Sequence, residues 1–136
     1  MREATAVVVG TVLLAASAAC SAPSPTTPAP PAGAPASVIL DAYLRDLVAG
    51  HCAAAREFAT ETFTAGHGDL CGAVKVSAYS VQGDPATPSS DEVVFSAILT
   101  TGAGGDGTIA AGRTTWFYDL RRQGGEWRIV GGGSGP

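Results

Sequence analysis

Residues 37–71 read SVILDAYLRDLVAGHCAAAREFATETFTAGHGDLC and contain the strongest helical pattern in the chain. Apolar side chains recur there with the spacing of one face of a helix, at Leu40, Tyr43, Leu44, Leu47 and Val48. The opposite face carries the charged residues Asp41, Arg45 and Asp46. Ser37 is a residue type that caps helix starts, and Gly50 is one that ends helices in a left-handed conformation. We therefore expect an amphipathic helix between them whose apolar stripe lies on a flat partner.

A second, shorter helix is predicted after Gly50. Its apolar face would be formed by Cys52, Ala55, Phe58 and Ala59. The run TAGHG at residues 64–68 is typical of an irregular turn, and it would bring residues 69–71 back towards Cys52.

From residue 73 the helical spacing gives way to alternation, which is typical of strands with one buried face. Strands are predicted over residues 73–79, 91–101, 108–122 and 127–130, with a turn at residues 83–90 (GDPATPSS). The connections are too short for parallel crossovers, so neighbouring strands should be antiparallel. The predicted fold class is α+β, with two N-terminal helices packed on a curved four-stranded antiparallel sheet.

The first residues have the composition of an export signal. Residues 1–19 contain one Arg near the start, an apolar run too short to span a membrane comfortably, and small residues before Cys20. They resemble the signal of bacterial lipoproteins, in which the cysteine is lipidated and becomes the mature N-terminus. This resemblance implies a lipid anchor on Cys20, at the extracytoplasmic face of the cell membrane. Ordinary secretion, with cleavage after Ala18, is the alternative.

The predicted domain organisation follows from the leader. Residues 20–36 are rich in Pro, Ala, Ser and Thr and have too few large apolar side chains for a core, so they are predicted to form a tether. One domain is expected over residues 37–131, followed by a flexible Gly-rich tail at residues 132–136.

The chain has three cysteines, an odd number for an exported protein in an oxidising compartment. If Cys20 carries lipid, Cys52 and Cys71 are left as one even pair. We therefore expect a structural Cys52–Cys71 disulfide, which would restrict the unfolded chain by closing a loop of about 20 residues.

The order of elements resembles the nuclear-transport-factor-2-like, or cystatin-like, superfamily, and in particular its small exported bacterial lipoproteins. The residues that carry this resemblance are the segment 44–71, with its Ala-rich second helix and Leu-Cys, and the closing segment 116–129, with its Gly-Gly turn and Trp-Arg-Ile. The resemblance implies a ligand cavity between helices and sheet, or a filled core in the same place. The residues that would line it are Tyr43, Phe58, Tyr79, Phe95, Trp116, Tyr118 and Trp127.

The sequence favours a non-enzymatic domain that binds a small apolar ligand or a protein partner. An isomerase-like or cyclase-like enzyme using His51, His67 or Asp119 in a cavity is the second hypothesis, although no catalytic motif is present. A metal-binding surface protein is the third, because His51, Cys52, His67 and Cys71 are metal-ligand types at poor spacing. No cofactor is predicted. A net charge of -4 without a Lys/Arg cluster argues against nucleic acid as a partner.

Overall fold

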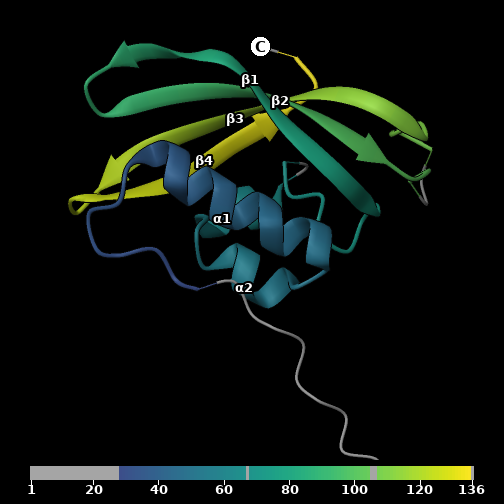
Figure 1. Cartoon of the computed structure of the whole chain (residues 1–136), viewed down its shortest axis with the longest axis horizontal. Helices are drawn as coiled ribbons and strands as arrows, with labels where there is room; N and C mark the ends of the chain where they lie inside the picture. The colour runs from purple at the N-terminus through teal and green to yellow at the C-terminus, as the bar shows by residue number, and fades with distance from the viewer. Residues whose placement is uncertain (1–27, 67, 105–106, 136) are drawn as a thin grey trace, which may run out of the picture.

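The computed structural model of the chain describes residues 28–66, 68–104 and 107–135. Within these residues, three helices precede a four-stranded sheet. The helices are α1 (Ala36–Ala49), α2 (Cys52–Arg56) and α3 (Glu61–Ala65), and the strands are β1 (Val76–Ser89), β2 (Glu92–Thr101), β3 (Gly112–Gln123) and β4 (Glu126–Gly133). Figure 1 shows the helices beneath the curved sheet. The predicted layer of two N-terminal helices is therefore wrong, because three short helices lie between residues 36 and 65.

The first helix follows its predicted stripe. Leu40, Tyr43 and Leu44 are fully buried, and Leu47 is nearly so. Gly50 ends the helix with a φ of 76°, a conformation that a Cβ would strain, as predicted. Ser37 does not cap the start, because the helix begins one residue earlier, directly after Pro35. Proline presets the backbone for a helix start and needs no hydrogen-bonded N–H there.

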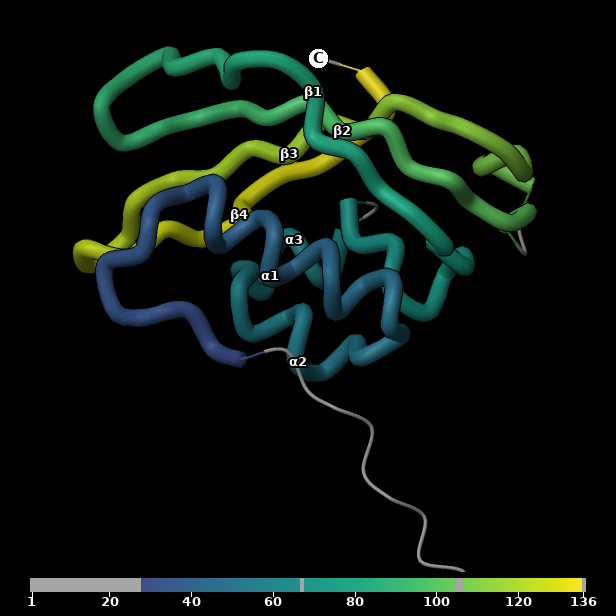
Figure 2. Tube along the Cα trace, in the orientation of Figure 1, coloured from purple at the N-terminus to yellow at the C-terminus, as the bar shows by residue number. Residues whose placement is uncertain are grey.

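The predicted second helix is divided into α2 and α3 by backbone pairing with the sheet. The Ile129 N–H donates to the Phe58 carbonyl (3.0 Å), and the Thr60 N–H donates to the Ile129 carbonyl (2.9 Å). Residues 58–60 thus cover the edge of β4, which a continuous helix would have left with unpaired backbone groups. The Thr60 hydroxyl then accepts from the Phe63 N–H and starts α3, which lies beneath β4 (Figure 2).

The prediction that Asp46 lies on the solvent face of α1 is wrong, because only 1 % of this residue is exposed. Its helix packs against α2 near this end, so a face that would be open on a lone amphipathic helix is covered. One of its carboxylate oxygens lies 3.6 Å from Nδ1 of His51, at the corner between the two helices.

The sheet is an antiparallel meander in the order β1-β2-β3-β4, as the short connections predicted. The predicted turn at residues 83–90 is wrong over most of its length, because β1 continues to Ser89. The strand lies at the sheet edge and its register shifts on either side of Ala86, so the prolines of this run are tolerated there. At the other edge, β4 runs through Gly133, which pairs with Phe117.

The core lies between the helices and one face of the sheet. Strand β2 buries Val93, Phe95, Ala97 and Leu99, in the alternation that its sequence predicted. Strand β3 contributes Trp116, Tyr118 and Leu120 on the same face.

Candidate functional site

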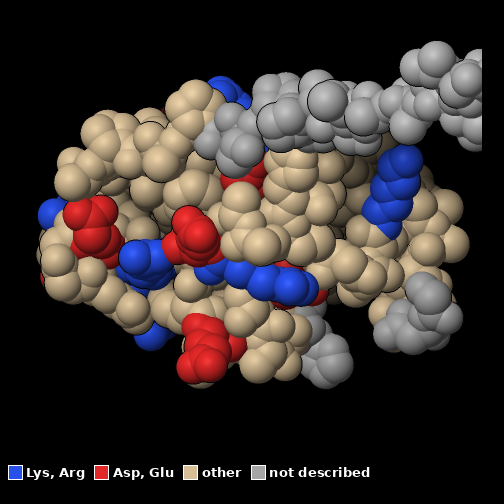
Figure 3. Space-filling view, turned by 90° about the horizontal axis from the view of Figure 1, so that it is seen from below, with Lys and Arg blue, Asp and Glu red and all other residues tan. Residues whose placement is uncertain are grey.

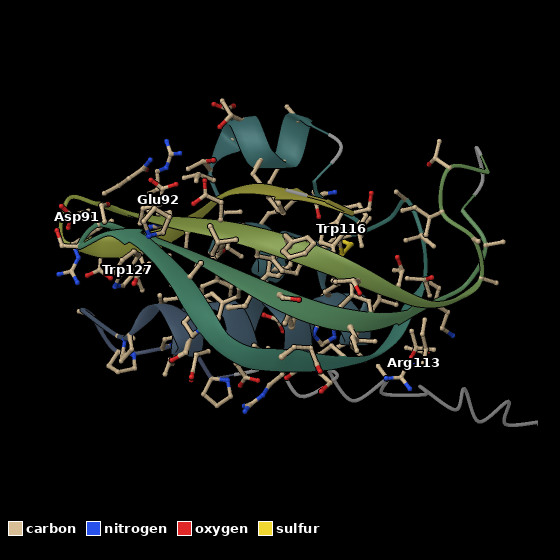
Figure 4. The ribbon with its side chains drawn as sticks, turned by 90° about the horizontal axis from the view of Figure 1, so that it is seen from above. Asp91, Glu92, Arg113, Trp116 and Trp127 are labelled. Atoms are coloured by element: carbon tan, nitrogen blue, oxygen red, sulfur yellow. A yellow bond between two sulfur atoms is a disulfide. The ribbon has the colours of Figure 1, made fainter. Side chains whose placement is uncertain are left out.

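A pocket of about 800 Å³ opens at one end of the layer between helices and sheet. It is bordered by the segment that follows α3, the β2–β3 loop, the start of β3 and the end of the chain. Figure 4 shows Arg113 and Trp116, which both line it, at one end of the sheet, and Asp91, Glu92 and Trp127 at the other. Its size falls within the usual range of small-ligand pockets.

The pocket has an apolar floor and a polar rim. Leu70, Val74 and Trp116 are only 1 %, 8 % and 6 % exposed, so they form the deep part of the lining. Arg113 and Ser134 are exposed and lie at its edge. This arrangement suits a ligand with an apolar body and a polar end.

The wall formed by residues 69–74 is held by the carboxylate of Asp69, which points away from solvent. Oδ1 accepts from the Tyr43 hydroxyl (3.2 Å) and from the Cys71 N–H (3.0 Å). Oδ2 accepts from Nε of Arg56 at 2.7 Å, and the same guanidinium donates to the Cys71 carbonyl at 3.0 Å. Both oxygens are therefore occupied, and the charge of Asp69 is compensated by a cation on α2.

The predicted disulfide is present and holds the same wall. Cys52 on α2 and Cys71 are bonded, with Cα atoms 5.4 Å apart. The two half-cystines also border a second groove of about 510 Å³ beside the end of α1, which shares Ala73 and Val74 with the larger pocket. The disulfide and the buried carboxylate of Asp69 thus hold the segment 69–74, which separates the large pocket from the second groove.

Three of the predicted lining residues belong to a filled core. Tyr43, Phe95 and Tyr118 are buried, and the ring of Tyr43 meets the rings of Phe63 and Tyr118 edge to face at 5.8 and 5.7 Å. Burial raises the pKa of both Tyr43 and Tyr118 far above the usual value, so both hydroxyls stay protonated. The Tyr118 hydroxyl has no hydrogen-bond partner among the described residues.

Of the remaining predicted lining residues, Trp116 borders the large pocket. Tyr79 lies on β1, where it donates to Oδ1 of Asp41 at 2.6 Å, and burial raises its pKa. Phe58 and Trp127 border a smaller hollow, of about 330 Å³, near the β3–β4 turn. The seven aromatic residues predicted to line the cavity are therefore spread over four environments: the filled core, the large pocket, the contact between β1 and α1, and the hollow near the β3–β4 turn.

The titratable residues proposed for catalysis are not gathered at the pocket. His51 lies at the α1–α2 corner beside Asp46. Asp119 is on β3, where partial burial raises its pKa while the guanidinium of Arg121, 3.3 Å away, opposes that shift. Neither residue lines the pocket, and His67 lies outside the described residues.

The proposed metal ligands are also dispersed. Cys52 and Cys71 are joined to each other, so neither offers a thiolate. No group of three or more His, Cys, Asp or Glu side chains suited to a metal occurs in the part of the chain that the structure describes.

Sequence reasoning missed Arg56, Asp69, Leu70 and Arg113. A signal for two of them existed, because Asp69 and Leu70 directly precede Cys71, whose pairing with Cys52 brings them to α2. No pattern marked Arg113, which reaches the pocket because the loop before β3 folds beside the segment that follows α3.

Charge on the helical side is mixed. Figure 3 shows Lys and Arg interspersed with Asp and Glu on this side. On α1, the exposed residues Arg45 and Asp41 form an ion pair at 2.6 Å. The visible surface thus has charges of both signs next to each other.

No protein-family model matches the chain, and searches of curated proteins and of solved structures also find no match. Among the described residues, the helices are too short or too polar for one of them to cross a bilayer.

Proposed function

We propose that this domain binds a small, largely apolar molecule and does not transform it. The proposal rests on the pocket beside Trp116, which has a buried apolar floor and opens to solvent at one end of the fold. Pockets of this size and lining are typical of small-molecule sites.

The state of the nearby acid favours binding over catalysis. A general acid or base must face its substrate, whereas both carboxylate oxygens of Asp69 are occupied by Tyr43, Arg56 and the Cys71 N–H. The hydroxyls of Tyr43 and Tyr118 lie within the packed core and keep their protons.

The binding domain would be held at the outer face of the cell membrane by lipid on Cys20, through the Pro-rich segment that follows it. The described end of that segment meets the domain away from the pocket, because the Gly33 N–H donates to the carboxylate of Glu126 at 3.1 Å, next to Trp127. Trp127 lies at the opposite end of the sheet from Arg113 (Figure 4), so tethering would leave the pocket mouth free.

Native mass spectrometry of the mature protein from its exporting host tests the binding proposal. We expect the parent to retain a small-molecule adduct and the Thr114→Phe variant to lose it. Thr114 lines the pocket and shares a sheet face with Trp116, so a Phe ring there would occupy the space. An adduct retained equally by both proteins would place the ligand elsewhere.

The anchor is tested separately with Cys20→Ser. The parent should have the mass of a lipidated mature chain and sediment with membranes, whereas the variant should be released or remain as precursor. Identical fractionation and identical mature mass for both proteins would rule out lipidation.

A further inference from the structure

We propose that the face of the sheet opposite to the helices docks a second copy of this chain, turned end for end, so that Arg113 of each copy faces Glu92 and Asp119 of the other. This interface leaves the proposed ligand pocket of each copy accessible, because that pocket lies between the helices and the sheet.

The alternation of β2 and β3 decides which side chains lie on this open face. On β2 the residues from Val93 to Leu99 alternate between buried and half-buried, and on β3 Trp116 and Tyr118 are buried towards the helices. In Figures 1 and 2 the helices lie on the other side of the sheet. The open face therefore includes the alternate residues of both strands, among them Glu92, Val94, Ile98, Arg113, Phe117 and Asp119.

The centre of the open face is apolar. Phe117 is half-buried and is paired with Ser96 on one side and with Gly133 on the other. Its diagonal neighbours on β2 are Val94 and Ile98, a separation that an aromatic side chain can bridge. With only small residues directly beside it, the ring of Phe117 leaves space that an apolar side chain of a second copy can fill, and burial of this surface favours association.

The two ends of the open face have opposite charge. At one end, Arg113 is exposed and makes no ion pair with any described residue. At the other end, Glu92 and Asp119 share the single guanidinium of Arg121, each at 3.3 Å, so one negative charge is left uncompensated. Figure 4 shows Arg113 and Glu92 at opposite ends of the sheet. Each end of the face is therefore complementary to the other.

A second copy turned end for end matches both ends at once. Arg113 and Arg121 lie equally far from Phe117 along β3, so a two-fold axis that crosses the strands near Phe117 brings the positive end of each copy to the negative end of the other. Over this length the four strands cover roughly 19 Å by 30 Å. Two copies would bury about 1,100 Å² in total, enough for a specific but weak interface.

The first test measures the mass of the particle in solution. The exported full chain carrying Cys20→Ser, which removes the proposed lipid site and allows work without detergent, is studied by sedimentation velocity over a series of concentrations. We expect a monomer–dimer equilibrium with a dissociation constant on the order of 10 μM, because interfaces near the lower size limit are weak. A chain that stays monomeric at every soluble concentration would overturn the proposal.

Two charge reversals test the orientation. Arg113→Glu and Glu92→Lys each place like charges at the facing ends, so each should weaken the dimer about tenfold or more. Mixing the two variants should restore nearly the parental affinity. In the mixed dimer the introduced glutamate of one copy faces the introduced lysine of the other, while the second pair of ends is unaltered.

Phe117→Ser removes the ring at the centre and should also weaken the dimer about tenfold or more. The matched control is Arg45→Glu, which makes the same charge change as Arg113→Glu on the exposed side of α1 and should leave the dissociation constant unchanged. Circular dichroism verifies folding, and the mixing experiment decides the orientation even if Phe117→Ser does not fold. A dimer unaffected by the charge reversals, or mixed variants that do not associate, would show that this face is not the interface.

The uncharged fluorescent probe N-phenyl-1-naphthylamine tests the pocket separately. Its affinity should be the same for the parent, Glu92→Lys and Phe117→Ser, because these side chains lie on the face away from the pocket. A probe that fails to bind the parent would contradict the proposed binding function and leave the dimer standing.

Discussion

The two halves of β3 lie in the same sheet but have different surroundings. In the sealed half, around Tyr118 and Leu120, the strand faces the packed core, where both side chains are fully buried and Tyr118 meets Tyr43 of α1. Around Arg113 and Trp116 it borders a pocket of about 800 Å³. The difference follows from length, because the 14 residues of α1 extend about 20 Å whereas the 12 residues of β3 extend about 40 Å. A helical layer shorter than its sheet leaves one end to be closed by loops.

The two halves are also stabilised differently. The sealed half depends on packed aromatic and aliphatic side chains. The wall of the open half, residues 69–74, depends on the disulfide and on the contacts of Asp69. Changes in the sealed half should therefore affect stability alone, and changes in the wall should affect both stability and binding.

Leu44→Ala should give the largest loss. The side chain is fully buried in the middle of α1, so its truncation removes apolar burial and leaves a cavity, lowering the free energy of unfolding by about 2–5 kcal/mol. Urea unfolding followed by fluorescence measures the loss. Where the variant is still folded, its affinity for N-phenyl-1-naphthylamine should equal that of the parent. A loss below half a kcal/mol would mean that the sealed half is not close-packed.

Cys52→Ser combined with Cys71→Ser should lower the free energy of unfolding by about 3 kcal/mol, because a bridge between residues 19 positions apart restricts the unfolded chain. Without the disulfide, residues 69–74 are less constrained, so the affinity for the uncharged probe N-phenyl-1-naphthylamine should also fall. Reduction of the parent with dithiothreitol should reproduce both effects. Unchanged probe affinity in the variant would show that Asp69 alone is sufficient to hold the wall.

The buried tyrosines predict a loss of stability at high pH. In the unfolded chain they release their protons near pH 10, whereas burial raises the pKa of Tyr43 and Tyr118 in the folded protein. The two tyrosines therefore contribute fully to the free energy of unfolding below about pH 10. Above that pH, the free energy of unfolding falls by about 1.4 kcal/mol per pH unit for each tyrosine. Urea unfolding between pH 9 and 11.5 measures the slope. Tyr118→Phe should reduce the slope by the share of one buried tyrosine, about 1.4 kcal/mol per pH unit.

The smallest effects should come from removing single hydroxyls at neutral pH, and they should have opposite signs. Tyr43→Phe removes a hydrogen bond to Asp69 and should lower the free energy of unfolding by about 1 kcal/mol. Tyr118→Phe removes a buried hydroxyl without a partner among the described residues and should raise it by about 1 kcal/mol. Equal losses in the two variants would indicate that the Tyr118 hydroxyl is hydrogen-bonded in solution.

Much of the fold could be predicted from the sequence because its patterns are local. The stripe of α1 and the end at Gly50 follow from 3.6-residue periodicity and from the freedom of glycine at positive φ. The buried face of β2 follows from simple alternation. The odd cysteine count led to the pairing of Cys52 with Cys71, which the structure contains.

The errors fall where distant parts of the chain meet. The predicted second helix is interrupted because Ile129, about 70 residues away, binds the backbone of Phe58 and Thr60. Asp46 is buried because α2 packs against α1, and the run of residues 83–90 extends as an edge strand because β2 offers it partners. Local propensity cannot register such contacts, because their free energy exists only after the chain has folded.

The sequence by itself determined the amphipathic first helix, the strand order, the cysteine pair and the composition of the leader. Only the tertiary structure decided that Tyr43, Phe95 and Tyr118 lie in a filled core while Trp116 borders the large pocket, and that the remaining aromatic residues predicted to line the cavity lie at neither place. The physical reason is that a pocket is the space left between elements of unequal length. Its position depends on how α1, the disulfide-bonded wall and the loop before β3 pack together, and no single stretch of residues encodes that arrangement.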